Sequence, residues 1–279
     1  MSATGPLQTG NAQHQYADPE HGFIVPAYGA SPYLRECLDS LRAQTRPSPI
    51  LISTSTPWPG LADLANEYGA RLAIRSPNAG IGRDWNTALA HANTSWVTLA
   101  HQDDIYLPRF TELTLAAAST HADTQLVMTG YGEVLDGVPR TRTAMLAIKR
   151  LLLELGYLGR DHIASRAAKR RLLRFGCPIP CPSVTLRVSP PGLRFREDLK
   201  VNLDWEAWLR LADQPGAFAR VRECAMLHRI HAASETSEGV RAGVRAREDL
   251  MMFESLWPAP VARLLARAYA LSYPTGNEA

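Results

Sequence analysis

Short apolar runs alternate with amphipathic segments along the first half of the chain. The apolar runs are five or six residues long and are bounded by turn residues, which is typical of buried strands; they lie at 22–26, 49–53, 71–75, 95–100 and 125–130. Between them, apolar side chains recur at helical spacing in 31–44, 61–68, 83–92 and 109–121. Strands that alternate with helices of this length predict βαβ units, and hence an α/β fold with a mostly parallel, nucleotide-binding type of sheet.

The first predicted helix, 31–44, has a recognisable start. Ser31 is suited to be its N-cap and Pro32 its first helical residue. Leu34 and three later apolar side chains share one face at helical spacing. We therefore expect the helix to begin directly after Ser31.

The pattern changes after residue 143. Basic amphipathic helices are predicted at 145–158 and 166–175, and further helices at 203–212 and 261–272. The first twenty residues carry no periodic apolar pattern, so we expect a flexible tail there.

Composition adds limits on the class of protein. A chain of 279 residues that is 46% hydrophobic and 20% charged can bury an ample core. With 30 basic and 27 acidic residues, the net charge of +3 gives no case for nucleic acid binding. Charge is unevenly spread, however, because the segment Arg140–Arg174 holds ten Lys or Arg and only two acids. This segment predicts a basic patch.

The four cysteines are too few and too scattered for a disulfide scaffold, so we expect reduced thiols. Cys177 and Cys181 are separated by three residues, two of them prolines, and have no nearby Cys/His pair, which argues against a zinc or redox site. The sequence has no apolar run of about 18 residues and no signal-peptide pattern at its start. These features predict a cytoplasmic protein that is neither secreted nor membrane-spanning.

Two adjacent carboxylates, Asp103 and Asp104, follow the apolar run 95–100. Ligands of open α/β sheets bind beyond the carboxyl ends of the strands, and paired carboxylates there suit a hard divalent cation that holds a diphosphate. The alternative is a helix cap, because Asp is a good N-cap and Pro108 is tolerated in a first turn. These residues alone leave both interpretations open.

Two other segments could serve a nucleotide ligand. Val25–Gly29, at the end of the first strand, offers backbone groups and an aromatic ring to a base, or is an ordinary strand-to-helix turn. The Gly-rich loop 78–86 places Arg83 at a helix N-terminus, where backbone N–H groups, the helix dipole and the guanidinium would stabilise a phosphate. It matches neither a P-loop nor a dinucleotide fingerprint, and a plain turn is the alternative.

Two segments of the second half carry candidate chemistry. Asp204 opens a predicted helix, where it is either the N-cap or a general base. His228 and His231 are expected to share one face of a strand. Isolated histidines are usually structural, but an imidazole beside a carboxylate-bound metal is a good ligand.

Together these segments resemble the family 2 glycosyltransferases with the A-type (GT-A) fold, specifically bacterial enzymes that build surface polysaccharides. The resemblance covers about residues 23–236 and rests on five segments in the family's order: VPAY at 25–28, NAGIGRDWNTAL at 78–89, HQDDIYLP at 101–108, DWEAWLRL at 204–211 and RIHAAS at 229–234. It implies a Rossmann-like central sheet flanked by helices, with a helical C-terminal part. It also implies a nucleotide-sugar-binding half (21–143), an acceptor-binding and catalytic half (144–236) and a C-terminal helical extension (237–279).

The resemblance also implies roles for single residues. Asp104, with Asp103 beside it, corresponds to the Asp-x-Asp-type motif that holds Mg²⁺ or Mn²⁺ on the nucleotide diphosphate, with Gln102 in place of the first Asp. Asp204 matches the base of an inverting transfer to an acceptor hydroxyl, and His231 matches a histidine near the metal. The residues expected to contact the donor are Pro26, Ala27, Tyr28, Ser53, Ser55, Asn78, Gly80, Arg83, Asn86, Gln102 and Asp103.

One departure from the family pattern concerns the base of the nucleotide. An acidic motif usually follows the second strand, and this chain has Ser53–Thr56 there. UDP, dTDP and GDP sugars therefore all remain candidate donors, and a catalytically silent nucleotide-binding or scaffolding protein is the alternative function. A nucleotidyltransferase is a third class, but Tyr28–Ser31 lacks the basic Gly-rich loop that it would need.

The basic region 144–175 corresponds to acceptor-facing structure in the family. One interpretation is a solvated helix face. The other is contact with a glycan or lipid-linked acceptor, or peripheral contact with the anionic inner face of the plasma membrane.

Overall fold

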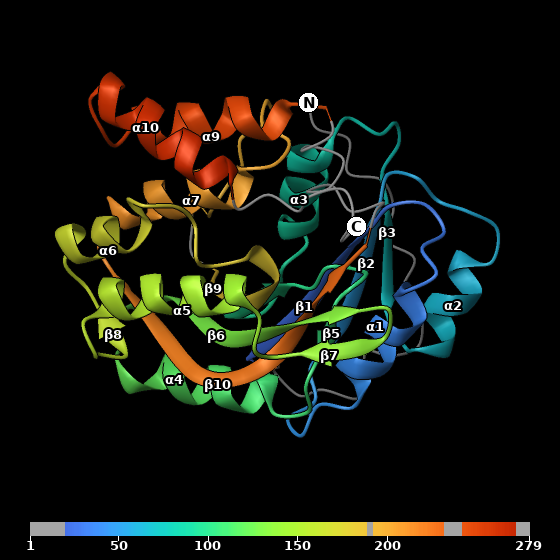
Figure 1. The fold of residues 1–279 in the computed structure, drawn as a ribbon. Coiled ribbons are helices and arrows are strands. Elements are labelled where there is room, and N and C mark those ends of the chain that lie inside the picture. Colours follow the sequence, from blue (N-terminus) through green and yellow to red (C-terminus); the bar gives the residue numbers. More distant parts are fainter. Residues whose placement is uncertain (1–19, 189–191, 232–241, 272–279) are drawn as a thin grey trace.

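The computed structural model describes residues 20–188, 192–231 and 242–271 (Figure 1). The expected flexible tail lies outside the described residues apart from Glu20, and so does Ser234 of the last sequence motif.

A single mixed sheet forms the centre of the described chain (Figure 1). Its strand order is β3-β2-β1-β4-β9-β6-β10-β5, with β7 paired to β6 and β8 paired to β10. The strands are β1 His21–Ala27, β2 Ile50–Thr54, β3 Arg71–Ile74, β4 Trp96–Leu99, β5 Ile105–Tyr106, β6 Thr124–Leu135, β7 Val138–Arg140, β8 His162–Ile163, β9 Val184–Arg187 and β10 Ala217–Ile230.

The sheet confirms the mostly parallel arrangement that the βαβ pattern predicts. Strand β1 lies parallel to β2 and β4, β2 to β3, and β6 to β10. The sequence pattern did not predict β9, which runs antiparallel between β4 and β6 and joins the two parallel groups. The strand is only four residues long and follows a proline-containing turn, so it carries too little periodicity to be recognised.

Helices cover both faces of the sheet (Figure 1). They are α1 Leu34–Arg42, α2 Leu61–Glu67, α3 Ile81–Leu89, α4 Phe110–Thr120, α5 Ala144–Tyr157, α6 Arg166–Leu173, α7 Leu203–Ala212, α9 Val244–Glu254 and α10 Ala259–Ala270. Successive residues of β1 point to opposite faces: Phe23 and Val25 pack with α1, α2 and α4, whereas Ile24 packs with α3 and the helices of the second half.

Helix α1 begins two residues later than its sequence suggests. Tyr33 is the residue that precedes the helix, and it makes no capping bond through its side chain. The Ser31 hydroxyl accepts a hydrogen bond from the Tyr33 N–H at 3.2 Å, so it closes a local turn instead of capping the helix. The prediction that Ser31 is the N-cap and Pro32 the first helical residue is therefore wrong, although the apolar face, including Leu34, is buried as expected.

Buried indole rings of α7 tie together several segments of the second half of the chain. Trp205 donates its indole N–H to the Leu173 carbonyl at 3.0 Å, and Trp208 donates to the Ile179 carbonyl at 3.3 Å. The ring of Phe253 in α9 packs edge-on against Trp205, at 5.1 Å between centroids. The predicted helical C-terminal part is thus present, and it packs on α7. No helix in the described ranges is both long and apolar enough to cross a lipid bilayer.

Candidate active site

The two aspartates lie where β4 ends, beside the end of β1. The Ala100 N–H donates to the Ile24 carbonyl at 2.8 Å, which extends the pairing of the two strands. Because β2 and β4 flank β1 on opposite sides, the strand order reverses at this point. Such a reversal opens a ligand-binding crevice at the carboxyl ends of the strands.

The helix-cap interpretation of the aspartates is wrong. Asp103 and Asp104 are followed by β5 and not by a helix, and α4 begins only at Phe110. Strand β5 pairs antiparallel with Met226 and Leu227 of β10. This short pairing carries the aspartates to the end of β10, more than a hundred residues away in sequence.

Asp104 is completely buried, and one of its oxygens is saturated with donors. Its Oδ1 accepts the Arg229 N–H at 2.8 Å and lies 3.0 Å from Nδ1 of His228. Burial lowers the pKa of His228, but the charge and the hydrogen bond of Asp104 outweigh this effect, so the pKa lies above its usual value. Sequence reasoning named His228 but did not place it in the site.

The other oxygen of Asp104 fits a metal. Asp104 Oδ2 and His101 Nε2 are buried and have no hydrogen-bond partner among the described residues. One atom each of His101, Asp103 and Asp104 lie within 4.8 Å of one another. A buried carboxylate oxygen without a donor is costly, and a divalent cation would remove that cost. Carboxylate oxygens with an imidazole nitrogen form a donor set that suits Mn²⁺, and the oxygens alone suit Mg²⁺.

Asp103 is the more accessible carboxylate of the pair. Its Oδ2 lies 2.7 Å from Nε2 of His231, whose ring packs against Tyr33. Burial alone would raise the pKa of Asp103. The hydrogen bond with His231 and the charges of the neighbouring imidazoles lower it by more, so the pKa lies below its usual value. Asp103 therefore belongs to the same cluster of possible ligand atoms as His101 and Asp104, and it links His231 to that cluster.

The two histidines do not share a strand face. Strand β10 ends at Ile230, and His231 lies beyond it. Residues three apart point to opposite faces of an extended strand. His228 and His231 meet neighbouring aspartates only because the chain leaves the strand between them.

Arg229 holds this arrangement together; it belongs to the sequence motif at 229–234, but sequence reasoning gave it no role. Its guanidinium donates to the Asp103 carbonyl at 2.7 Å and to the Glu36 carboxylate, and it lies over the ring of Tyr33. The side chain is 6% exposed. An arginine in a strand that reads as ordinary polar sequence gives no local signal of such a role.

Gln102 is engaged by the protein backbone. Its amide oxygen accepts the Tyr28 N–H at 3.0 Å, and its amide nitrogen donates to the Tyr28 carbonyl at 3.2 Å. The residue that replaces the first carboxylate of the motif therefore ties the loop after β1 to the aspartate loop. Tyr28 itself is 59% exposed beside Pro26 and Ala27, so its ring is free to meet a ligand.

The segment after β2 contacts a carboxylate from another part of the chain. Ser53 and Ser55 are buried, and the Ser55 hydroxyl donates to Asp84 of α3 at 2.7 Å. Burial raises the pKa of Asp84, and the Ser55 hydrogen bond with the charges of Arg75 and Arg83 opposes this rise. An acidic group therefore lies beside the end of β2, although none follows β2 directly in the sequence.

The Gly-rich loop precedes α3, as expected. Some of its side chains bond to the protein backbone, whereas Arg83 is exposed. Asn78 Oδ1 accepts the Gly80 N–H at 2.9 Å, and Gly80 precedes the helix with a φ of 95°, which favours glycine. Arg83 is exposed in the first turn. The Asn86 amide exchanges hydrogen bonds with the Phe195 backbone at 2.7 and 2.9 Å, so it anchors that segment to α3.

Asp204 lies in the first turn of α7 but is not its N-cap, which is Asn202. Its carboxylate accepts the Trp205 N–H at 2.7 Å. Burial raises the pKa of Asp204 to about 6, although the Trp205 N–H, Arg245, the Cys181 N–H and Lys149 oppose this rise. A carboxylate with this pKa is a better base than an ordinary aspartate and is still ionised at neutral pH.

A turn of 3₁₀ helix, Cys181–Ser183, connects Asp204 to the aspartate loop. The Tyr106 hydroxyl, from β5, donates to the Pro182 carbonyl at 3.0 Å. Burial raises the pKa of the Cys181 thiol, and the charges of both Asp204 and Asp104 raise it further. The turn therefore lies within electrostatic reach of the proposed metal position and of Asp204.

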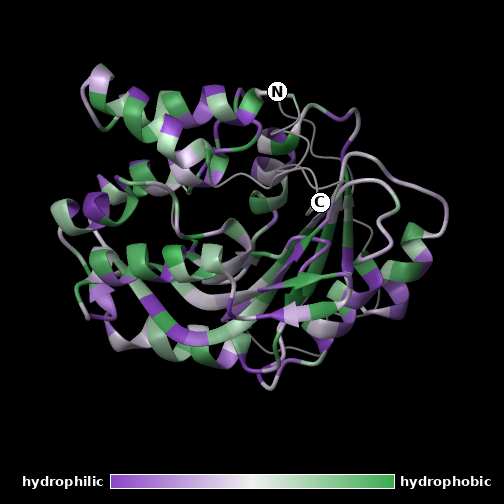
Figure 2. Cartoon of the chain, in the orientation of Figure 1, coloured by the Kyte–Doolittle hydropathy of each residue, from purple (hydrophilic) through white to green (hydrophobic). Residues whose placement is uncertain are grey.

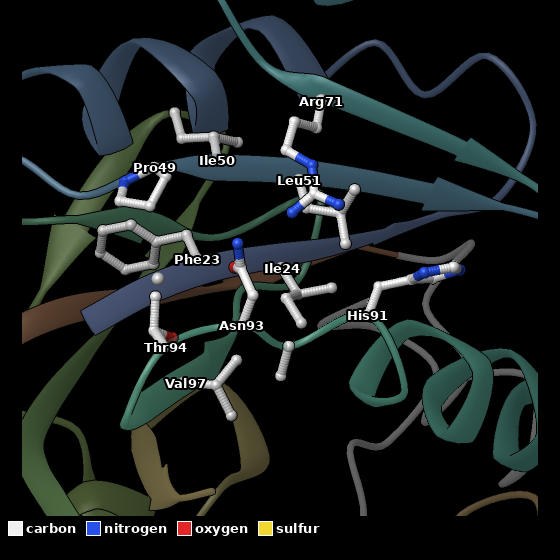
Figure 3. A pocket seen from close by; sticks show the side chains of 12 residues that line it. Phe23, Ile24, Pro49, Ile50, Leu51, Arg71, His91, Asn93, Thr94 and Val97 are labelled. Carbon is white, nitrogen blue, oxygen red and sulfur yellow. The ribbon is translucent and has the colours of Figure 1, made fainter. Parts of the chain in front are cut away.

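A small hollow elsewhere on the sheet is a poor candidate for this chemistry. It lies at the amino ends of β1 to β4, where Phe23, Pro49 and Thr94 line it beside Arg71 and His91 (Figure 3). The carboxylates described above stand at the opposite ends of these strands.

Solved glycosyltransferases share this fold. The chain is similar to a mannosyltransferase from Pyrobaculum calidifontis solved with GDP-mannose and Mn²⁺, with a TM-score of 0.61 and 17% identity, covering 95% of this chain and 73% of that one. It is also similar to residues 1–349 of S. aureus TarS solved with UDP-GlcNAc, with a TM-score of 0.60 and 14% identity, covering 90% and 71%. The fold is therefore that of the GT-A enzymes.

Sequence relatives agree with this fold. A glycosyltransferase of Rickettsia prowazekii is 24% identical over 243 residues, 86% of this chain and 70% of that protein. A glycosyltransferase of Haemophilus influenzae is 31% identical over 97 residues, which span only 36% of its own length. The model of glycosyl transferase family 2 matches residues 23–183, more than half of the chain. The protein belongs to the family 2 glycosyltransferases.

Proposed function

We propose that the protein is an inverting, metal-dependent glycosyltransferase that moves a sugar from a nucleoside diphosphate to a hydroxyl of a glycan or lipid-linked acceptor. The observation that carries this proposal is the buried Asp104, whose second oxygen lacks a partner among the described residues, together with the raised pKa of Asp204 nearby. Sugar transfer needs positive charge to stabilise the diphosphate leaving group and a base for the acceptor. Asp104 would hold the metal ion that supplies this charge, and Asp204 would be the base.

The residues proposed to hold Mn²⁺ or Mg²⁺ are Asp104 and, from the family resemblance, His231. The geometry adds His101 and Asp103, each with one atom within 4.8 Å of the other and of Asp104. Such an ion supplies positive charge to the departing diphosphate. Asp103 would orient His231, and the exposed guanidinium of Arg83 at the start of α3 would bind phosphate oxygens.

Asp204 is proposed to take the proton of the acceptor hydroxyl. As the oxygen attacks the anomeric carbon from the face opposite the diphosphate, the C–O bond to the diphosphate breaks and the configuration inverts. The Trp205 N–H donates to Oδ1 of the carboxylate and helps to fix its orientation. A pKa near 6 lets the group be ionised before transfer and accept a proton during it.

The remaining donor contacts are proposed from position. Pro26, Ala27 and Tyr28 would face the base and the ribose, while Asn78, Gly80, Asn86 and Gln102 would shape the donor crevice. Asp84, held by Ser55 beside Ser53, would accept from a base N–H in place of the carboxylate that is absent after β2. This carboxylate favours an active donor site over a catalytically silent protein.

The division into a donor half (21–143) and an acceptor half (144–236) remains part of the proposal. The setting is proposed to be the cytoplasm, in synthesis of cell-surface polysaccharide, with peripheral contact of residues 144–175 with the anionic inner face of the membrane.

The test is slow hydrolysis of nucleotide sugars by the purified protein. UDP, dTDP and GDP sugars are incubated with Mn²⁺, Mg²⁺ or chelator, and the released nucleoside diphosphate is measured. We expect one donor class to be cleaved only with metal. Equal rates with chelator would contradict the metal dependence, and no cleavage of any donor would favour the silent alternative.

A further inference from the structure

Helix α5 presents an apolar stripe to solvent. Ile148, Leu151, Leu155 and Leu158 are 53%, 58%, 54% and 62% exposed. Because they follow one another at three or four residues, the first three lie on one face of the helix and Leu158 continues that face at its C-cap. Figure 2 shows apolar colour along α5 in this view.

The opposite face of α5 is also apolar. Leu146, Leu153 and Tyr157 are buried against the rest of the protein. A helix that is apolar on two opposite sides is normally covered on both, whereas an ordinary surface helix has a polar outer face. The exposed stripe is therefore a surface that suits an apolar partner.

Exposed arginines frame the stripe. Arg142 precedes the helix and Arg160 follows it, both are exposed, and neither forms an ion pair with another described residue. Arg150 lies on another side of the helix, where its charge acts on Tyr131 of β6 and Cys224 of β10. Glu154 is the only acid on α5, and its carboxylate is held by Arg220 and Arg222. The surface around the stripe is thus positively charged.

Other basic residues of the segment are used within the protein. Arg166 and Arg170 both pair with Asp213. Lys169 is completely buried and donates to the carbonyls of Gln214 and Gly216 at 2.6 and 2.7 Å. The exposed basic charge of residues 140–174 is therefore smaller than their sequence suggests, and it gathers around α5.

We propose that α5 is the membrane-docking element, with Ile148, Leu151 and Leu155 inserted below the headgroups of an anionic bilayer and the arginines at the level of the lipid phosphates. Docking would bring a lipid-linked acceptor to the site, and this purpose rests on the proposed function. The membrane contact itself does not depend on it. Lys149, on another side of α5, acts by its charge on both Asp204 and His228, so the docked helix borders the reacting groups.

Charge favours a lipid surface over a second copy of the chain. A symmetric dimer through this stripe would bring the same arginines of both copies together, with Glu154 already paired. Anionic lipid offers the opposite charge over the whole face.

The experiment is flotation of the full-length protein with vesicles, without donor or acceptor. Vesicles of phosphatidylcholine are compared with vesicles that contain one third phosphatidylglycerol. The variants are L151S/L155S, R142Q/R160Q, and the matched control L264S, which changes a leucine on α10 that is 68% exposed. Melting temperature is measured for each variant, because all these side chains are exposed and folding should be unaffected.

We expect the wild type and L264S to float with anionic vesicles, and each double variant to bind about tenfold more weakly. Neutral vesicles should bind the wild type about tenfold more weakly as well. Absence of wild-type flotation, or flotation of both double variants at the wild-type level, would overturn the proposal. A dimer in gel filtration that L151S/L155S dissociates, without wild-type flotation, would assign the stripe to a second copy instead. Sugar release in solution is measured separately, so each proposal can fail alone.

Discussion

Replacing Asp204 with Asn separates catalysis from stability at one position. The amide keeps an oxygen that can accept the Trp205 N–H, but it cannot take a proton. Loss of a general base lowers transfer by about 10²–10⁴-fold. Wild-type transfer should also rise with pH through about pH 6 to a plateau, because the base must be ionised.

The same substitution should stabilise the fold. A carboxyl whose pKa is raised from 3.8 to about 6 in the folded state binds more protons folded than unfolded between these values, so its contribution to stability falls as pH rises through this window. The difference is about 3 kcal/mol at pH 8. It shrinks to less than about 1 kcal/mol near pH 4, where the carboxyl is protonated in the folded state and close to half protonated in the unfolded state.

Urea unfolding of the wild type and D204N at pH 4 and pH 8 measures this effect beside a transfer assay. E206Q is the matched control, because Glu206 lies in the same turn, is 14% exposed and forms an ion pair with Arg210. We expect D204N to be inactive and more stable at pH 8, and E206Q to transfer normally. Near-wild-type transfer by D204N would refute the base, and an inactive variant that is less stable at pH 8 would indicate a structural role.

Three further substitutions probe the donor side of the site. D104N should weaken Mn²⁺ binding by about tenfold or more, since the charge of the buried carboxylate is lost; calorimetry with Mn²⁺ alone measures this, and unchanged affinity would remove Asp104 from the metal site. Q102A should raise the donor KM about tenfold with a smaller change in kcat, because two hydrogen bonds to Tyr28 disappear. D84N should raise the KM for the preferred nucleotide about tenfold or more by removing a charge-assisted acceptor, and competition between UDP, dTDP and GDP sugars shows whether preference changes. Equal KM values for D84N and the wild type would leave Asp84 as a structural partner of Ser55.

The sequence predicted those elements whose pattern is local. Strands β1, β2 and β4 are short apolar runs next to amphipathic helices, and their period identifies them without tertiary information. Strand β10 contains Arg220, Arg222 and Glu223 in its middle, which interrupts the apolar pattern. Its bulged pairing with β6 and its ion pairs to Glu154 compensate for those polar side chains, and neither is visible in a local window.

The sequence predicts the site residues that directly follow a strand, but not the contacts between residues of strands that are distant in sequence. Asp103 and Asp104 can be recognised in the sequence because they follow a buried strand. Their contacts with His228 and Arg229 span more than 120 residues and depend on the two-residue strand β5, which is too short to carry a periodic signal. The carboxylate of Asp84 was overlooked for the same reason, since its partner Ser55 lies on another element.

The central claim is that a divalent ion at Asp104 holds a nucleoside diphosphate for sugar transfer. Calorimetric titration of UDP, dTDP and GDP into the protein, with Mn²⁺ and with chelator, and into D104N with Mn²⁺, tests it most directly. The account predicts that one nucleotide binds the wild type with Mn²⁺ and binds at least about tenfold more weakly without metal or in D104N. Binding of equal strength with chelator, or no binding of any nucleotide in the presence of Mn²⁺, would contradict it.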